Sequence, residues 1–290
     1  ILKIPFVITK CGGENPSGYF PHTRYLVLFS KENLMYFRNN KKFKNCSLFY
    51  IPNRVSVITQ DNKRINELKS KLNITQPVIL RISRISEQHS NSIYQSIALV
   101  KKLNLEGISC CLVIIGTVTD ELLAEKIQSL TSNCNYIHIV SCNEYTKSAN
   151  QLIDIGDIVV GTGRGFMEAA VLKKRLLAPT KNTELPIVIT NNNIKHFHDR
   201  NFSSRVDCHI NENENYTRIK DLICGKLTEK HFSNYDEYAE NNFLLSKSID
   251  KYNNLYSISK YDRVSDWLMP ILGIMKLSLI NVKQFLKNES

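Results

Sequence analysis

Five short runs of Val, Ile and Leu with almost no polar alternation constrain the fold more than any other feature of the chain. They read PVILRIS (77–83), CCLVIIG (110–116), YIHIV (136–140), DIVV (157–160) and LPIVIT (185–190). Strands of this composition are buried on both faces, which is the environment of a parallel sheet covered by helices. Helical segments separate the runs, so the sequence predicts an α/β fold with a doubly wound parallel sheet.

Size and composition agree with such a fold. With 290 residues and 42% hydrophobic content, the chain can bury one large core or two medium ones. The eight cysteines are scattered without a C-x-x-C pair, and HFHD (196–199) has no second cluster at ligand spacing, so we expect no metal site. We expect reduced thiols in a cytoplasmic protein. No signal peptide is visible, and because the chain begins with Ile1 we expect a fragment.

The charge balance favours an anionic partner. The formal net charge is +11 at pH 7, which suits nucleotide phosphates, anionic lipid headgroups or nucleic acid. Lys and Arg are spread widely, with a modest cluster at residues 38–44, and a solvated basic surface explains part of the excess. The sequence contains no nucleic-acid-binding motif, so we expect no nucleic-acid partner.

Four regions follow one another along the chain. Residues 1–62 alternate short strands with one helical stretch and are interpreted as the remnant of an N-terminal acceptor-side α/β domain. Residues 63–76 are polar and charged, which indicates a linker or a surface helix. Residues 77–210 hold the buried strands and are predicted to form a Rossmann-like domain, and residues 211–290 are predicted to be helical.

The end of the helical region has an apolar periodicity of its own. Between residues 264 and 287, apolar residues recur at spacings of three or four: Trp267, Leu268, Ile271, Leu272, Met275, Leu279, Val282 and Leu286. Pro270, Lys276 and Asn281 interrupt the stretch, so it is not a membrane span. We predict that it packs back onto the protein. An amphipathic helix at a membrane surface is the alternative, because its polar side carries lysines.

The segment 156–171, GDIVVGTGRGFMEAAV, carries the strongest functional signal. A short apolar run enters a loop with Gly161, Gly163 and Gly165, and an apolar helix follows with Glu168 in or near its first turn. Glycines let backbone amides approach a ligand closely, and a helix N-terminus favours phosphate. A carboxylate just beyond can accept hydrogen bonds from sugar hydroxyls. The pattern therefore indicates a sugar–diphosphate site.

Other interpretations of this segment stay open. A strand, a glycine turn and a helix follow one another in any doubly wound sheet, and the helix dipole alone favours an acid near a helix start. A dinucleotide-binding fingerprint is not matched, because Phe166 occupies the position of the third small residue.

Ligands of doubly wound sheets bind beyond the carboxyl ends of the strands, which selects a set of candidate residues. Arg84 follows the first strand and offers a planar donor fork suited to phosphate, although a surface arginine flanking a strand is the structural alternative. The full donor-site prediction comprises Arg84, Gly116, Thr117, Gly161, Thr162, Gly163, Arg164, Gly165 and Glu168. The sequence identifies no catalytic residue.

Across residues 20–205 the chain resembles the GT-B retaining glycosyltransferases of family 4 (group 1), which use nucleotide-sugar donors. YLVLFSKENLMYF followed by LFYIPNRV looks like the end of that family's N-terminal domain. VILRISRIS is similar to the strand that carries the family's Gly-Arg arginine, and residues 156–179 are similar to its signature with the Glu-Ala pair. TKCGGENPSGYFP (9–21) also looks like transferases that build bacterial surface polysaccharides.

The resemblance implies a function and a role for several residues. Arg84 would contact the donor diphosphate, the amides of 161–165 would face the phosphates or sugar, and Glu168 would hold the ribose hydroxyls. The donor would be a nucleotide sugar with no separate cofactor, and the acceptor a polysaccharide or lipid-linked glycan, with retention of configuration. Such a protein would be cytoplasmic, with peripheral contact at the inner face of the cell membrane as an alternative location.

Three departures from the family pattern support a second hypothesis. His89 falls at the position of the family's lysine, Val160 falls at the position of its first acid, and most of an N-terminal domain is missing. The alternative is therefore a degenerate or truncated GT-B module that binds nucleotide sugar without turnover. A GT-B-type sugar-nucleotide epimerase would need catalytic acids and a histidine that the sequence does not place.

Overall fold

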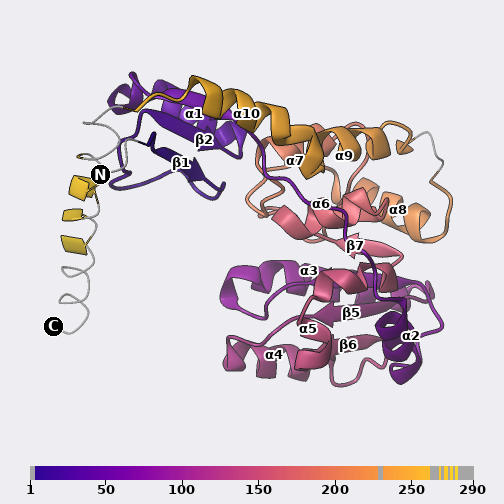
Figure 1. The fold of residues 1–290 in the computed structure, drawn as a ribbon. Helices are drawn as coiled ribbons and strands as arrows, with labels where there is room; N and C mark the ends of the chain where they lie inside the picture. Colours follow the sequence, from indigo (N-terminus) through magenta and orange to yellow (C-terminus); the bar gives the residue numbers. More distant parts are fainter. Residues whose placement is uncertain are drawn as a thin grey trace. The chain divides into compact units, whose positions relative to one another are not determined.

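The computed structural model describes residues 4–227 and 231–261, together with residues 268, 271–273, 275–276 and 278–279. The chain divides into two compact units, and each is described by itself (Figure 1). The small unit comprises Ile1–Asn53, Asp199–Asn201 and Ser246–Ser290, and the large unit comprises Arg54–His198 and Phe202–Leu245.

The small unit is built on a parallel sheet of three strands in the order β1-β2-β3. The strands are β1 (Val7–Lys10), β2 (Tyr25–Leu28) and β3 (Ser47–Tyr50). Leu26 and Leu28 pack against helix α1 (Lys31–Asn39) and the short helix η1 (Lys41–Phe43), whereas Tyr25 and Val27 pack against α10 (Ile249–Ile258). Alternate side chains of β2 therefore serve two faces, which explains why this strand is apolar throughout.

The large unit contains a sheet of six strands in the order β6-β5-β4-β7-β8-β9. They are β4 (Val78–Ile82), β5 (Cys111–Ile115), β6 (Ile137–Val140), β7 (Ile158–Val160), β8 (Arg175–Ala178) and β9 (Ile187–Val188). All neighbours pair in parallel except β8 and β9, which are antiparallel. Strand β4 comes first in the chain and is flanked by β5 and β7, so the strand order reverses between β4 and β7. This switch point is where open α/β sheets bind ligands.

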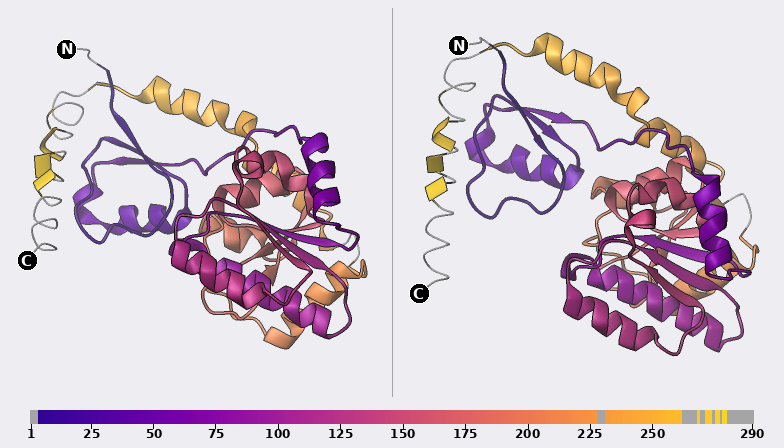
Figure 2. Two further views of the ribbon diagram at one scale, coloured as in Figure 1. Left: turned by 90° about the horizontal axis from the view of Figure 1, so that it is seen from below. Right: turned by 60° about the horizontal axis from the view of Figure 1, so that its bottom comes forward.

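Helices cover both faces of this sheet (Figure 2). Helices α3 (Glu87–Leu105), α4 (Glu121–Thr131) and α8 (Glu212–Ile223) pack on one face with Ile79 of β4. The other face, with Val78 and Leu80, is covered by α2 (Asn62–Lys71), α5 (Asn143–Thr146), η2 (Ala149–Ile155), α6 (Gly163–Val171), α7 (Ile194–Asp199) and α9 (Tyr235–Phe243). The predicted α/β fold with a doubly wound parallel sheet is confirmed.

Two strands differ from the prediction. Residues 175–178 form a parallel strand, β8, which the sequence analysis left within the segment after the glycine loop. Helix α6 ends before it, and Lys173 adopts a positive φ of 59° that turns the chain into the strand. The run at 185–190 contributes only the short strand β9, which closes the sheet at its edge in antiparallel orientation.

Residues 63–76 are not an extended linker. Helix α2 occupies most of them, and its Ile65 and Leu68 are buried in the core of the large unit. Burial of side chains of this size stabilises a fold by about 1.5–3 kcal/mol each. Of the two interpretations of this polar stretch, the structure shows the surface helix, and only two positions of this short, charged helix are buried.

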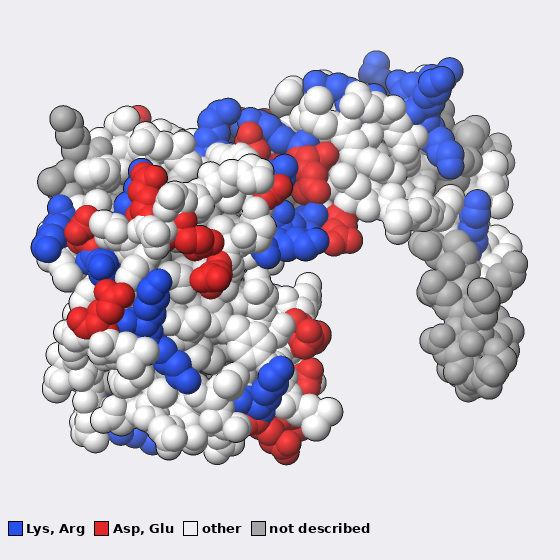
Figure 3. Space-filling model, turned by 180° about the vertical axis from the view of Figure 1, so that it is seen from behind, with Lys and Arg blue, Asp and Glu red and all other residues white. Residues whose placement is uncertain are grey.

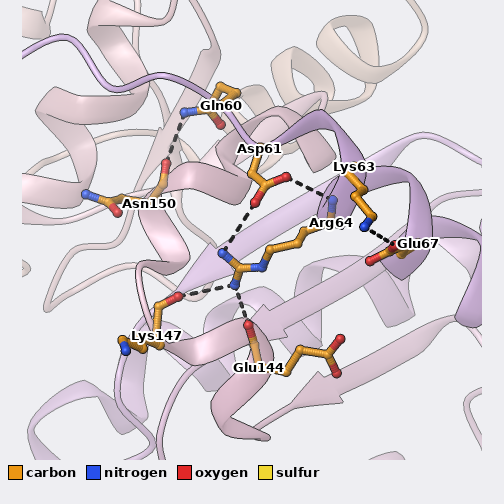
Figure 4. A network of polar contacts seen from close by, with 8 residues as sticks. All are labelled: Gln60, Asp61, Lys63, Arg64, Glu67, Glu144, Lys147 and Asn150. Atoms are coloured by element: carbon orange, nitrogen blue, oxygen red, sulfur yellow. Dashed lines mark hydrogen bonds and ion pairs between the residues drawn. The ribbon is translucent and has the colours of Figure 1, made fainter.

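A polar network attaches the start of α2 to α5 and to η2 (Figure 4). Arg64 donates to the backbone carbonyls of Glu144 and Lys147, and the carboxylate of Asp61 caps the helix by accepting from the Arg64 amide. Gln60 donates to the carbonyl of Asn150 at 3.1 Å. The chain entering the large unit is thereby fixed to the segment that carries Asn150.

The helical region predicted for 211–290 is divided between the two units. Helices α8 and α9 belong to the large unit, and the chain leaves it near Leu244, whose extended backbone ends α9. Helix α10 belongs to the small unit. In the segment 264–287, Leu268, Ile271, Leu272, Met275 and Leu279 are described and are 41–64% exposed. Burial of the predicted apolar face is therefore not seen at these positions, and Trp267, Val282 and Leu286 lie outside the described residues.

Within the described ranges, no helix combines the length and apolar content that crossing a bilayer requires.

All eight cysteines are free thiols, and burial raises the pKa of Cys110 to about 12 and that of Cys111 to about 11.

Candidate functional site

The carboxyl ends of β4 and β5 lie side by side at one edge of the large sheet. A Cβ atom at Gly116 would lie 1.7 Å from the carbonyl oxygen of Ser83, so only glycine permits this approach of the two backbones. Ile85 and Val118 continue the pairing beyond the two strands. The predicted residues Arg84, Gly116 and Thr117 are therefore neighbours at this edge.

The next strand, β7, leads into the glycine loop. A Cβ at Gly161 would lie 2.8 Å from the Cα of Phe166, so glycine is required for the chain to turn into α6. The Gly161 amide donates to the carbonyl of Leu177 and the Gly163 amide to that of Phe202, both at 3.0 Å. These two amides are thus occupied, which leaves the first-turn amides of Arg164 and Gly165, which have no acceptor within the helix, for a ligand.

Phe166, which replaces the small residue of a dinucleotide fingerprint, has a packing role. Its ring stacks on Phe202 with centroids 3.9 Å apart and planes 10° apart. Phe202 also accepts from the Gly163 amide through its carbonyl. The stacked pair therefore fixes the glycine loop against the segment that follows α7.

Glu168 lies in the second turn of α6, and the first turn contains no acid. The helix dipole therefore does not explain its position, because that effect is confined to the terminal turn. Its side chain is 6% exposed, and Oε1 accepts from Arg164 Nε at 2.8 Å and from Asn150 Nδ2 at 3.4 Å. A small pocket of about 30 Å³ adjoins it, lined by Ile82, Asn150, Ile153, Val159, Val160, Gly161, Gly165 and Glu168.

Arg84 is an exposed cation at this edge of the sheet. Among the described residues it has no hydrogen-bond or ion-pair partner. Its guanidinium is therefore available to an anion that enters the crevice. Arg164 is the second exposed cation here, with its side chain 67% exposed, but it is already paired with Glu168.

Arg81 is a third cation at the switch point, and it is not among the residues predicted from the sequence. It lies in β4 and is 1% exposed. Nη1 donates to the carbonyl of Val160 at 3.0 Å, and Nη2 donates to Ser92 Oγ at 2.8 Å and to Thr162 Oγ1 at 3.3 Å. The sequence feature that could have identified Arg81 is a single charged residue within the otherwise apolar run VILRI.

His89 occupies the position where the resembling family has lysine. It lies in the first turn of α3, half-buried, and its pKa is lowered by burial and further by the charges of Arg81 and Arg84. A histidine with a lowered pKa is neutral at pH 7. Position 89 therefore adds no full positive charge to the site at neutral pH.

The structure brings the predicted residues together in two neighbouring groups. Gly161, Gly165 and Glu168 border one pocket, which also contains the unpredicted Asn150 of η2, while Arg84, Gly116 and Thr117 follow the adjacent strands. Asn150 gave no sequence signal because it lies in a polar stretch far from the loop. In the described part of the chain, no three His, Cys, Asp or Glu side chains gather at a spacing that could hold a metal ion.

Comparison with known proteins gives a fold assignment. No protein-family model and no curated protein matches the chain. A glycosyltransferase from Rickettsia africae ESF-5 superposes with a TM-score of 0.58 at 16% identity, covering 87% of this chain and 70% of that one. Anabaena HepE in complex with UDP and glucose superposes with a TM-score of 0.53 at 12% identity, covering 81% of this chain and 63% of that one.

TarM is a third similar structure, with a TM-score of 0.51, 16% identity and coverage of 80% of this chain and 43% of that one. At these identities the likeness shows the fold, which is that of GT-B glycosyltransferases. The chain spans less than two thirds of the length of HepE and TarM.

Proposed function

We propose that the chain is a glycosyltransferase that moves a sugar from a nucleotide-sugar donor, with the donor held by the large unit. The observation that carries the proposal is the convergence of three features at the β4/β7 switch point. Among the described residues, Arg84 is an unpaired cation and the first turn of α6 offers free amides, and Glu168 borders an adjoining pocket. HepE, whose fold is similar, has been crystallised with UDP and glucose.

The geometry fits the chemistry of donor activation. In sugar transfer, the bond between the sugar C1 and the diphosphate oxygen breaks, and the acceptor oxygen bonds to C1 while its hydroxyl proton is released. Negative charge grows on the departing diphosphate. Arg84 and the amides of Arg164 and Gly165 would stabilise that charge, and such preorganised donors are an effective form of catalysis. The carboxylate of Glu168 would accept from the ribose hydroxyls.

The finer parts of the proposal rest on the family resemblance. They are membership of family 4, retention of configuration at C1, and a polysaccharide or lipid-linked glycan as acceptor. A lipid-linked acceptor would require the protein to reach a membrane surface.

The surface charge of the small unit supports such contact. Arg38, Lys41, Lys42 and Lys44 are exposed within seven residues of α1 and η1, and Figure 3 shows Lys and Arg side chains gathered over this unit. Each basic residue near an anionic membrane surface contributes about 1 kcal/mol. We therefore propose anionic lipid headgroups as a partner of this surface, tested by sedimentation with phosphatidylglycerol vesicles. Lys41→Glu with Lys42→Glu should abolish binding, and equal binding by this variant would contradict the proposal.

A binding module without turnover is the second candidate. His89 and Val160 replace two charged residues of the resembling family, which favours it. The two candidates separate when nucleotide-sugar consumption is measured beside binding. A binding module would bind a nucleoside diphosphate and the corresponding nucleotide sugar. It would release no nucleoside diphosphate from the nucleotide sugar over many hours, with or without glycan acceptors.

The test of donor binding is titration calorimetry with UDP, GDP, ADP and the corresponding nucleotide sugars. We expect one base to be preferred. Arg84→Ala should lower the affinity for the preferred nucleotide. The control Arg218→Ala should leave that affinity unchanged, because Arg218 lies on α8 and is paired with Glu214. Absence of binding to every nucleotide would refute the proposal.

A further inference from the structure

Arg81 is a fully buried cation that has no carboxylate partner in the described ranges. Its three acceptors are all neutral, namely one backbone carbonyl and two hydroxyls, and its Nε has no partner among the residues that the structure describes. Burial alone accounts for its lowered pKa of about 10, and no acid contributes. Removing an unpaired charge from water is strongly unfavourable. The described residues of the large unit therefore provide no counter-charge in contact with Arg81.

One of the three acceptors lies at the glycine loop. Thr162 occupies the N-cap position of α6, yet its side chain does not cap the helix. Its Oγ1 accepts from Arg81 Nη2 instead. A hydroxyl that accepts in one direction still has its own proton to donate in another. Thr162 can therefore donate to a ligand at the N-terminus of α6, beside the free amides of Arg164 and Gly165.

We propose that Arg81 is a positioning residue for the donor diphosphate: it orients the Thr162 hydroxyl as a phosphate donor and supplies a buried positive charge behind the glycine loop. This inference rests on the proposed function and specifies how its phosphate subsite works. The ligand completes the charge balance that the protein lacks. Exposed Arg84 and buried Arg81 then act on the same anion, the first by contact and the second through Thr162.

A purely structural role explains Arg81 less well. Three neutral acceptors could be satisfied by a neutral donor, so the contacts themselves do not require a charge. The field of Arg81 also extends beyond its own contacts, because it helps to lower the pKa of His89 in α3. A fixed positive charge whose field extends to α3 would also stabilise an anion that binds nearby.

The test compares Arg81→Met, Arg81→Lys, Thr162→Val and the double variant Arg81→Met/Thr162→Val. Affinities for inorganic pyrophosphate, UDP and uridine are measured by calorimetry, and melting temperatures are measured without ligand. Arg81→Met and Thr162→Val should each lower the affinities for pyrophosphate and UDP by about tenfold or more and leave the affinity for uridine unchanged. Arg81→Lys should restore part of the loss. Because Arg81 acts through Thr162, the fold-loss of affinity for pyrophosphate and UDP in the double variant should be much smaller than the product of the two single fold-losses.

Arg81→Met removes a buried unpaired charge but also leaves the Val160 carbonyl without its donor, so the melting temperature establishes whether the variant folds. Unchanged affinities for pyrophosphate and UDP would overturn the inference. It would also be overturned if the double variant lost as much affinity as the product of the two single losses, or if the affinity for uridine fell equally. If Arg81→Met does not fold, Thr162→Val decides alone by the same criterion. If the parent protein binds pyrophosphate in an Arg81-dependent way but no nucleotide sugar, the proposed function fails and the phosphate subsite stands. If it binds neither, both fail.

Discussion

Individual charged side chains at the carboxyl edge of the large sheet differ in exposure, and exposure decides what each can do for a ligand. Arg84 is exposed and unpaired among the described residues, so it can move onto a phosphate at little cost. Glu168 is almost fully buried, and Arg164 already balances its charge. A carboxylate held in this way is a fixed acceptor, which suits the two neighbouring hydroxyls of a ribose.

Arg84→Ala should weaken nucleoside diphosphate binding by removing one charge-assisted phosphate contact. Such a contact is worth about 1.5–3 kcal/mol, which corresponds to roughly a tenfold to hundredfold loss of affinity. The melting temperature of the ligand-free protein should not change, because the side chain is exposed. Calorimetry on Arg84→Ala measures the effect directly, and parental affinity in this variant would show that the arginine does not contact the ligand.

Glu168→Gln should lower affinity for the nucleoside part of the ligand and leave pyrophosphate affinity unchanged. Glutamine keeps the size and one acceptor oxygen but accepts more weakly from hydroxyl groups. Uridine, UDP and pyrophosphate titrations distinguish the two parts of the site. Arg218→Ala is the control, since this arginine is paired with Glu214 on α8. A large fall in the melting temperature of Glu168→Gln without ligand would indicate a structural role instead.

His89 should couple nucleotide binding to protonation. Its pKa is lowered from 6.5 in the folded chain, so the unfolded chain takes up the proton first as the pH falls below 6.5. The free energy of unfolding should therefore decrease from pH 6.5 downwards, until the pH reaches the lowered pKa. His138 contributes in the same direction, since burial also lowers its pKa.

A bound diphosphate near His89 should raise the pKa of the imidazole and cause proton uptake below pH 6.5. Calorimetry in buffers of different ionisation enthalpy measures that uptake. His89→Asn should abolish it and flatten part of the stability profile. Identical proton uptake by the parent and by His89→Asn would place the anion away from α3.

At the scale of secondary-structure elements, the attachment of α2 to η2 holds Asn150 in place beside Glu168. Arg64 bridges to two backbone carbonyls, and Gln60 accepts from the Asp154 amide at 3.0 Å. Asn150 lies between these contacts and donates to Glu168. The start of α2 is therefore connected to the pocket through one short helix.

Arg64→Ala should lower the free energy of unfolding by about 1–3 kcal/mol, because two carbonyls lose a charged donor. It should also weaken nucleoside affinity modestly, because it releases the carbonyl of Lys147, which lies between α5 and η2. Chemical denaturation and uridine titration measure the two effects. Lys63→Ala is the matched control, since Lys63 is 85% exposed and its ion pair with Glu67 is 4.0 Å long. Equal destabilisation by both variants would show that the network is not the cause.

The elements differ in how well the sequence predicted them, for physical reasons. Strands β4 to β7 are apolar on both faces, so pattern alone located them and the adjacent glycine loop. Helix α2 buries only Ile65 and Leu68, too few for a periodic signal. Strand β8 follows α6 after a single turn, which made its four residues look like part of the preceding segment.

Candidate residues followed the same logic. Arg84, Gly161 and Glu168 could be predicted because strand ends and loops are visible in the sequence. Arg81 could not be selected, because its importance depends on burial and on its contacts with Ser92 and Thr162. Asn150 reaches the pocket through the packing of η2 against α6, and that contact leaves no local pattern.

For the whole molecule, the fold and the charge distribution favour an anionic ligand. The net charge is +11, and the β4/β7 switch point of the large unit carries the cations Arg81, Arg84 and Arg164 together with the carboxylate of Glu168. GT-B glycosyltransferases share this fold at low identity. The account therefore depends on one claim, that a nucleoside diphosphate binds at the N-terminus of α6.

A crystal structure of the protein with the tightest-binding nucleoside diphosphate tests that claim most directly. We expect the diphosphate to lie against the amides of Arg164 and Gly165, within hydrogen-bond distance of Thr162 Oγ1 and Arg84, with the ribose at Glu168. A nucleotide bound elsewhere in the chain, or with its phosphates away from α6, would contradict it.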